Sequence, residues 1–316
     1  MGAVSALRPQ GQGHNQGRWQ GLLGDPGLLA GAAGGLVSAI LALWAMRGLP
    51  LGTGLFWLAS FPLFAAGLGF GAAAAVVAGL LGILLVALVQ GGFAAMTYLV
   101  LFGVPAPLLV ATALRAGKLS LSLPLALLGL WPLLVLLATA AFLADDGGLE
   151  ATMRDAMAAS LARLGIPAPE EFVAALVRVK AGAIGFWAAV SLLANAVAAV
   201  GFLAKRHLLA APKPDWAAVR LPVWYPLLPA AALGLFLAMP AESDILALSA
   251  LLVLLVPLFL QGVAGVHARL RGRKGRRPML AGFYLLLVLF LQVMGPGLVA
   301  LGLYDQFLRR QAPRQS

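Results

Sequence analysis

Two long apolar runs near the end of the chain, residues 245–266 and 279–303, most constrain what it can fold into. Each approaches or exceeds the roughly 20 residues that an α-helix needs to cross the hydrocarbon core of a bilayer. Similar runs recur along the 316 residues, of which 62% are hydrophobic and only 10% charged. A soluble fold could not bury this much apolar surface. The sequence therefore predicts an integral membrane protein.

The pattern predicts an all-α fold, a polytopic transmembrane bundle of eight or nine spans with one amphipathic helical insertion outside the membrane. The expected spans are residues 28–46, 52–64, 68–89, 93–114, 121–143, 181–203, 223–239, 245–266 and 279–303. The expected division of the chain is a disordered tail (1–27), an N-terminal bundle (28–143), an amphipathic external segment (144–179), a C-terminal bundle (180–308) and a basic tail (309–316).

The external segment has apolar residues three or four apart, which is typical of one helical stripe: Leu149, Met153, Met157, Leu161 and Leu164. Prolines at 167 and 169 interrupt this helix. Glu170 and Glu171 then suit the first turn of a new helix, because acidic side chains favour the positive end of the helix dipole. We expect that helix to continue into the sixth span.

The charge of the connecting segments alternates along the chain. Arg115 with Lys118 gives +2, residues 145–178 give −3, 205–220 give +3, Glu242 with Asp244 gives −2, and 269–277 give +6. Because positive segments stay in the cytoplasm, this alternation predicts a cytoplasmic N-terminus. A ninth full span would place Arg309, Arg310 and Arg314 outside. Either the tail is an exception, or a break at residues 295–297 turns the last segment back, so the count stays at eight or nine.

The residues that most chemistry needs are missing from the apolar interiors. The chain has no cysteine, and its three histidines, His14, His207 and His267, are scattered. Away from their ends, the apolar runs hold no ionisable side chain of the kind that builds proton relays or catalytic centres. We therefore expect no enzyme, no catalytic or metal-binding residues and no cofactor. The net charge of +11 lies mostly beside apolar runs, so nucleic acid is not an expected partner.

Neutral polar residues in the later spans are the best candidates for a site. These are Asn195, Gln261, Tyr284 and Gln292, together with the break Gly295, Pro296 and Gly297. Pro296 lacks an N–H and should free the carbonyl of Gln292, which must then find a partner at membrane depth. The cluster is interpreted either as a ligand site or as hydrogen bonding that serves helix packing. No ligand is identified by these residues.

The loop at 269–277 carries six basic residues: Arg269, Arg271, Arg273, Lys274, Arg276 and Arg277. One interpretation is a topology anchor beside anionic lipid headgroups. The other is a docking surface for a cytoplasmic partner.

Short stretches also carry a family resemblance. They are Leu58-Ala59-Ser60-Phe61-Pro62, Gly67-Leu68-Gly69-Phe70-Gly71, Gln261-Gly262, Arg277-Pro278 with Phe283-Tyr284, and Leu301-Gly302-Leu303-Tyr304-Asp305. In order and spacing the chain resembles, over about residues 28–310, the YybS-like bacterial membrane proteins, the domain-of-unknown-function 2232 family. It is more distantly similar to the substrate-binding membrane subunits of energy-coupling-factor transporters and to the cell-shape protein MreD. The resemblance implies a bacterial cytoplasmic (inner) membrane and no particular activity.

Two functional hypotheses follow. The first is a small-molecule binding or transport component that lacks its own energy-coupling machinery and borrows a cytoplasmic ATPase partner. The second is a non-catalytic scaffold of the cell envelope that recruits protein partners. A ligand retained through purification would favour the first, and a stoichiometric protein partner the second.

Overall fold

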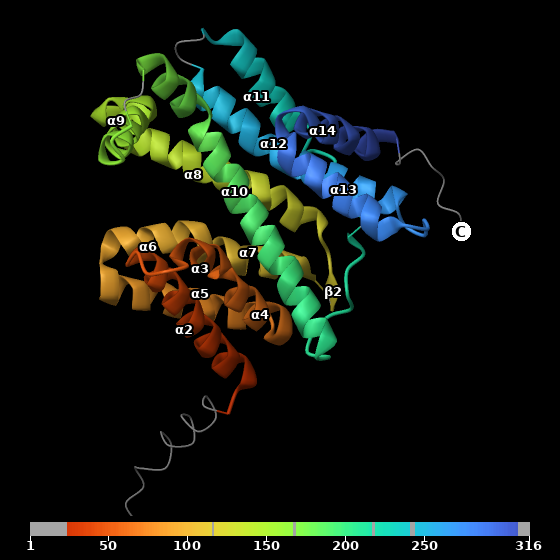
Figure 1. The fold of residues 1–316 in the computed structure, drawn as a ribbon. Coiled ribbons are helices and arrows are strands. Elements are labelled where there is room, and N and C mark those ends of the chain that lie inside the picture. Colours follow the sequence, from red (N-terminus) through yellow and green to blue (C-terminus); the bar gives the residue numbers. More distant parts are fainter. Residues whose placement is uncertain (1–23, 116, 167–168, 217–218, 241–243, 309–316) are drawn as a thin grey trace, which may run out of the picture. The chain divides into compact units, whose positions relative to one another are not determined.

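The computed structural model describes residues 24–115, 117–166, 169–216, 219–240 and 244–308. Within these ranges the chain is almost entirely helical (Figure 1). The exception is a small antiparallel pair, β1 (Leu114–Arg115) and β2 (Lys118–Leu119), in which Leu114 lies opposite Leu119. The predicted all-α bundle is confirmed. By its contacts the chain divides into two compact units, the described parts of 1–111 with 198–210 (unit 1) and of 112–197 with 211–316 (unit 2).

Seven helical stretches of the described chain are long and apolar enough to cross a membrane. They are Pro26–Met46, Gly52–Phe70, Ala72–Gln90, Gly92–Ala113, Ser122–Phe142, Glu170–Lys205 and Ile245–Arg269. A bent pair, Arg276–Leu289 with Leu291–Phe307, raises the number to eight if it is counted as one span. The expected span at 223–239 is shorter than predicted. Its helix, Leu227–Ala238, has 12 residues and reaches only about 18 Å, against a hydrocarbon core of about 30 Å.

Unit 1 consists of helices of 5 to 21 residues, together with the last turns of a helix shared with unit 2. Its elements are α2 (Pro26–Met46), α3 (Gly52–Leu58), α4 (Ser60–Phe70), α5 (Ala72–Gln90), α6 (Gly92–Tyr98), the π-helix η1 (Leu99–Gly103) and α7 (Pro105–Ala113). The third span begins at Ala72 rather than at 68, because Gly71 takes a positive φ of 99° that ends α4. Residues 68–70 therefore belong to the second span.

Small residues let the helices of unit 1 pack closely. A Cβ at Gly35 would collide with the backbone of Ala78, and one at Gly67 would lie 2.6 Å from the Cβ of Ala75. In hydrocarbon, where no water drives helices together, such close backbone approach supplies the packing energy. Gly67, in the segment 66–71, is thus used for packing.

One polar group of unit 1 is satisfied within the protein. The buried Ser38 hydroxyl donates to the carbonyl of Ala59 over 2.5 Å and lies 2.6 Å from the hydroxyl of Tyr98. Three helices are thereby joined at membrane depth, since the residues come from α2, the α3–α4 junction and α6.

Unit 2 is built around α12 (Ile245–Arg269), the most buried of the seven long helices. The other elements are α8 (Ser122–Phe142), the 3₁₀ turn η2 (Ala144–Asp146), α9 (Gly148–Arg163), the larger part of α10 (Glu170–Lys205), α11 (Leu227–Ala238), α13 (Arg276–Leu289) and α14 (Leu291–Leu308). Helices α8, α11 and α14 all pack on α12.

Glycines set the closest approaches to α12. A Cβ at Gly262 would overlap the carbonyl of Leu298 in α14, and one at Gly302 would overlap the carbonyl of Leu258 in α12. The two helices therefore cross with their backbones in contact, which leaves no room for a side chain at either position. A Cβ at Gly182 of α10 would likewise collide with the side chain of Leu252 in α12.

The predicted amphipathic segment forms α9, and α10 runs without interruption from Glu170 through the sixth span to Lys205, as expected. The apolar stripe of α9 is used mainly at its start. Leu149 is buried with Leu136 of α8 and Ala181 of α10, and Met153 packs against them, whereas Leu164 at the far end is exposed.

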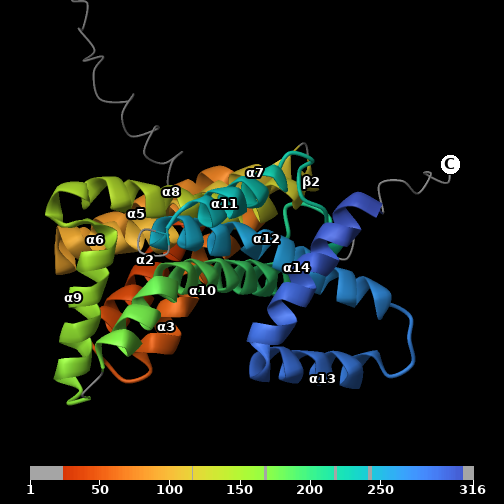
Figure 2. The ribbon, with the colours of Figure 1, turned by 90° about the horizontal axis from the view of Figure 1, so that it is seen from above.

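The last apolar run is broken, but not where the sequence predicts. The helical path bends by 118° between α13 and α14, at Phe290, and Figure 2 shows this elbow clearly. Gly295, Pro296 and Gly297 instead lie inside α14. Pro296 falls in the second turn of α14, where it removes only one backbone hydrogen bond. Both Pro296 and the Gln292 side chain are exposed, so the helix tolerates the proline there. Residues 309–316 and 1–23, which include most of the two predicted tails, lie outside the described residues.

Candidate functional site

A network of two buried glutamines holds α12 to α14 and to the segment before α11. Gln261 of α12 accepts from the backbone N–H of Leu221 (2.9 Å) and donates to the carbonyl of Gly302 (2.9 Å) and to the side-chain oxygen of Gln306 (3.1 Å). Gln306 in turn donates to the carbonyls of Leu221 (2.9 Å) and Pro222 (3.3 Å). Both side chains are almost completely buried.

This network uses all of the amide hydrogens of its two glutamines. A primary amide has two N–H donors, and each of the four donors here has an acceptor in the protein. Because a buried donor without a partner costs about 1–3 kcal/mol, the closed network favours the packed arrangement of α12, α14 and residues 221–222. The hydrogen bonds of Gln261 therefore agree with the packing interpretation of this residue.

An ion pair lies at the end of the same two helices. Arg269 donates from Nη1 to Oδ2 of Asp305 and from Nη2 to Oδ1, both over 2.8 Å, and Nη1 also donates to the carbonyl of Gly265 over 3.0 Å. Asp305 is 5% exposed. Paired hydrogen bonds of this kind give geometric specificity as well as energy, so the crossing of α12 over α14 is held at its end.

The other end of α12 also has an ion pair. Asp244, which precedes α12 and is buried, accepts from Arg178 of α10. Within the part of the chain that the structure describes, its second oxygen, Oδ1, has no hydrogen-bond partner, and the Nε of Arg178 has none either. The central helix of unit 2 is thus linked to α10 at its start and to α14 at its finish.

The six basic residues of 269–277 divide into two groups. Arg269 pairs with Asp305, and Arg271 pairs with Asp215, which precedes α11, over 2.6 and 3.2 Å. The hydrogen bond from Arg271 to Asp215 raises the pKa of the guanidinium above its ordinary value. The remaining four side chains are exposed and form no ion pair with any residue that the structure describes: Arg273, Lys274, Arg276 and Arg277.

The structure does not join the remaining predicted cluster residues to Gln261 by hydrogen bonds. The hydroxyl of Tyr284 lies 2.8 Å from Nε2 of His267, and so links α13 to α12. Asn195 donates to the carbonyl of Ser191 over 2.9 Å, one turn earlier in α10. Gln292, Pro296 and Gly297 are exposed on α14.

Two residues of the network and ion pair, Gln306 and Asp305, were not among the predicted site residues. The predicted last span ended at 303, two or three residues before them. Their spacing was a usable signal, because Gln306 lies one helical turn after Gly302 and therefore on the same face of a continued helix.

The described residues hold no group of three or more His, Asp or Glu side chains that could bind a metal ion. The chemistry that the amide network, the ion pairs and the basic loop can provide is hydrogen bonding and charge. Comparisons of the chain with protein-family models, with curated proteins and with solved structures find no match.

Proposed function

We propose that this protein is a non-enzymatic, multi-pass membrane component that works by recruiting a protein partner. The docking surface consists of the four unpaired basic residues, Arg273, Lys274, Arg276 and Arg277, with α13 behind them. The observation that carries the proposal is that two of the six basic residues of the loop form ion pairs within the protein and four do not pair with any described residue. Arg269 and Arg271 are tied to the protein by Asp305 and Asp215, so the loop is held at its base while the other four charges point into solvent.

Helix α13 supports the same surface. It begins at Arg276 and has 14 residues, about 21 Å, which is too short to cross the hydrocarbon core alone. Leu287 is its buried residue, packed with Phe259 and Leu298, while Val288 and Leu289 are 78% and 64% exposed. A short helix with a basic start and accessible apolar sides offers a partner both a charged contact and an apolar one.

The chemistry of the surface defines the partner by charge. Four cations within five residues attract an acidic face, which steers association and selects against basic proteins. A transport component without energy-coupling machinery would use this surface for its cytoplasmic ATPase, and an envelope scaffold would use it for an envelope protein.

Membership of the YybS-like family and a location in a bacterial inner membrane remain predictions. A small-molecule site at the buried amides also remains a prediction, and the paired hydrogen bonds of Gln261 do not favour it.

The test replaces all four residues, R273Q/K274Q/R276Q/R277Q, and compares partners isolated from native membranes after cross-linking. The matched control is R115Q/K118Q/K205Q/K213Q. It removes the same charge from exposed residues that the charge pattern places on the same side of the membrane. We expect an acidic protein to accompany the parent and control at a constant ratio, and to fall at least about tenfold with the loop variant.

Salt and topology complete the test. Because exposed charges are screened over about 3 Å at 1 M salt, the partner should be released from the parent by 1 M salt. Equal recovery of partner with both variants would contradict the proposal. Loss of correct insertion in the loop variant alone would show a topology anchor instead.

A further inference from the structure

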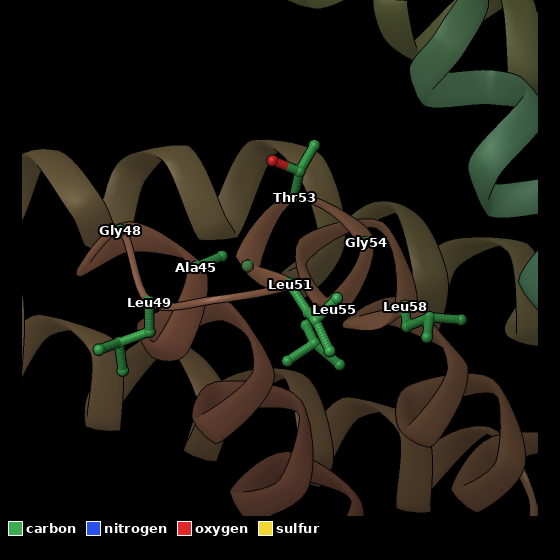
Figure 3. Close-up of a pocket in the computed structure, with 9 residues that line it drawn as sticks. Ala45, Gly48, Leu49, Leu51, Thr53, Gly54, Leu55 and Leu58 are labelled. Carbon is green, nitrogen blue, oxygen red and sulfur yellow. The ribbon is translucent and has the colours of Figure 1, made fainter.

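The corner between α2 and α3 contains an apolar hollow that the proposed docking function does not use. It has a volume of about 460 Å³ and is lined by Ala45, Gly48, Leu49, Leu51, Gly52, Thr53, Gly54, Leu55 and Leu58 (Figure 3). Among the described residues that line it, Thr53 alone has a polar side chain, and Figure 3 shows it directed away from the leucines. The lining therefore suits a hydrocarbon.

The backbone keeps this corner open. Gly48 and Leu51 both have positive φ, 67° and 63°, which reverses the chain sharply between the two helices. Trp44 holds the reversal, because its Nε1 donates to the carbonyl of Pro50 over 2.9 Å. Leu51 is left 85% exposed at the rim, an unfavourable place for a leucine in water.

The hollow lies where hydrocarbon meets headgroups. Helix α2 has 21 residues and so spans about 30 Å, the thickness of the hydrocarbon core. Its C-terminal end therefore reaches the interface, and Arg47 follows there as the capping residue. Arg47 is exposed and forms no ion pair with the part of the chain that the structure describes.

We infer that this corner binds an anionic phospholipid of the surrounding bilayer. One acyl chain occupies the hollow against Leu51, Leu55 and Leu58, and the phosphate lies at the guanidinium of Arg47. The hollow is apolar, and its lining residues Ala45 and Gly48 flank Arg47 in the chain, a cation that has no ion pair with any described residue; together they match the two ends of such a lipid. The cation selects an anionic headgroup over a zwitterionic one, because the latter carries its own positive charge.

Gly54 provides a specific way to fill the hollow. It lies one turn before Leu58 on the same face of α3, and a Cβ there would meet nothing within 4 Å. Gly54→Phe should therefore fold normally and occupy the space of the acyl chain. The matched control is Gly92→Phe, which is also in unit 1, near the start of a helix at a span end, and open to a Cβ, but not in the hollow.

The measurement is native mass spectrometry of the purified full chain, titrated with phosphatidylglycerol or phosphatidylcholine. We expect the first phosphatidylglycerol to bind the parent and Gly92→Phe at least about tenfold more tightly than it binds Gly54→Phe. Arg47→Gln should remove the preference for phosphatidylglycerol while phosphatidylcholine binding stays unchanged. Equal affinities of Gly54→Phe and Gly92→Phe would overturn the assignment of the hollow. Equal affinities of the parent for both lipids would overturn the assignment of an anionic headgroup to the site.

Discussion

Arg269 and Asp305 form an ion pair through two hydrogen bonds of 2.8 Å, and this pair joins the end of α12 to the end of α14. The residues are 36 positions apart in the chain, and the helices that carry them cross through Gly262 and Gly302. The amide pair Gln261 and Gln306 joins the same two helices. Glycine contact, amide network and ion pair together define one joint of unit 2.

Asp305→Asn should weaken this joint. It removes the charge of a buried carboxylate and leaves Arg269 without its counter-ion, for an expected loss of about 1.5–3 kcal/mol in the free energy of unfolding. Asp215→Asn is the matched control, because the Arg271–Asp215 pair is exposed on both sides and should contribute less than about 1 kcal/mol. Thermal unfolding in detergent measures both. If Asp215→Asn lost as much free energy of unfolding as Asp305→Asn, burial would not determine how much an ion pair contributes here.

Gln261→Leu should destabilise the protein by roughly 1–3 kcal/mol, because it leaves the N–H of Leu221 and the side-chain oxygen of Gln306 without partners. Gln292→Leu, on an exposed position of α14, should have little effect. The double variant Q261L/Q306L should lose less than the sum of the two single changes, since both remove the same network. Strict additivity in chemical unfolding would show that the two amides act independently.

Gly302→Ala should disrupt the crossing of α12 and α14, because the new methyl group would overlap the carbonyl of Leu258. Overpacking of this kind typically costs about 1–3 kcal/mol. Gly297→Ala, in the same helix, meets open space and should be neutral or stabilising by up to about 1 kcal/mol. Melting temperatures of the two variants give the comparison. If Gly297→Ala lowered the melting temperature more than Gly302→Ala, the result would favour the predicted break at 295–297 over the helix found there.

Topology can be checked with single cysteines, because the parent chain has none and supplies an unlabelled background. Ala158→Cys in α9 and Lys274→Cys in the basic loop are both on exposed positions. The positive-inside rule predicts that an impermeant maleimide labels Ala158→Cys in intact cells and labels Lys274→Cys only after the membrane is opened. The reverse pattern would invert every assignment of sides.

Most of the spans were predictable from apolar length, and the small misplacements have local causes. Residues 68–70 were predicted in the third span but belong to the second, because Gly71 adopts a positive φ that ends the helix. A Gly-rich run permits such a conformation at several positions, so the sequence does not say which glycine adopts it. The elbow at Phe290 was predicted six residues too late, because proline was taken as the break although α14 accommodates Pro296 in its second turn. Phe290 itself carries no sequence signal for a bend.

Membership in the class of helical membrane proteins follows from the chain alone, because the length and polarity of a run are local properties that the bilayer selects directly. The alternation of charge between runs is equally local. The partners of polar residues are not local: Gln261 was recognised as a buried amide, but its bonds to Leu221 and Gln306 depend on how α12 and α14 cross. That crossing is set by backbone contact at Gly262 and Gly302, a three-dimensional fit that only the tertiary structure decides.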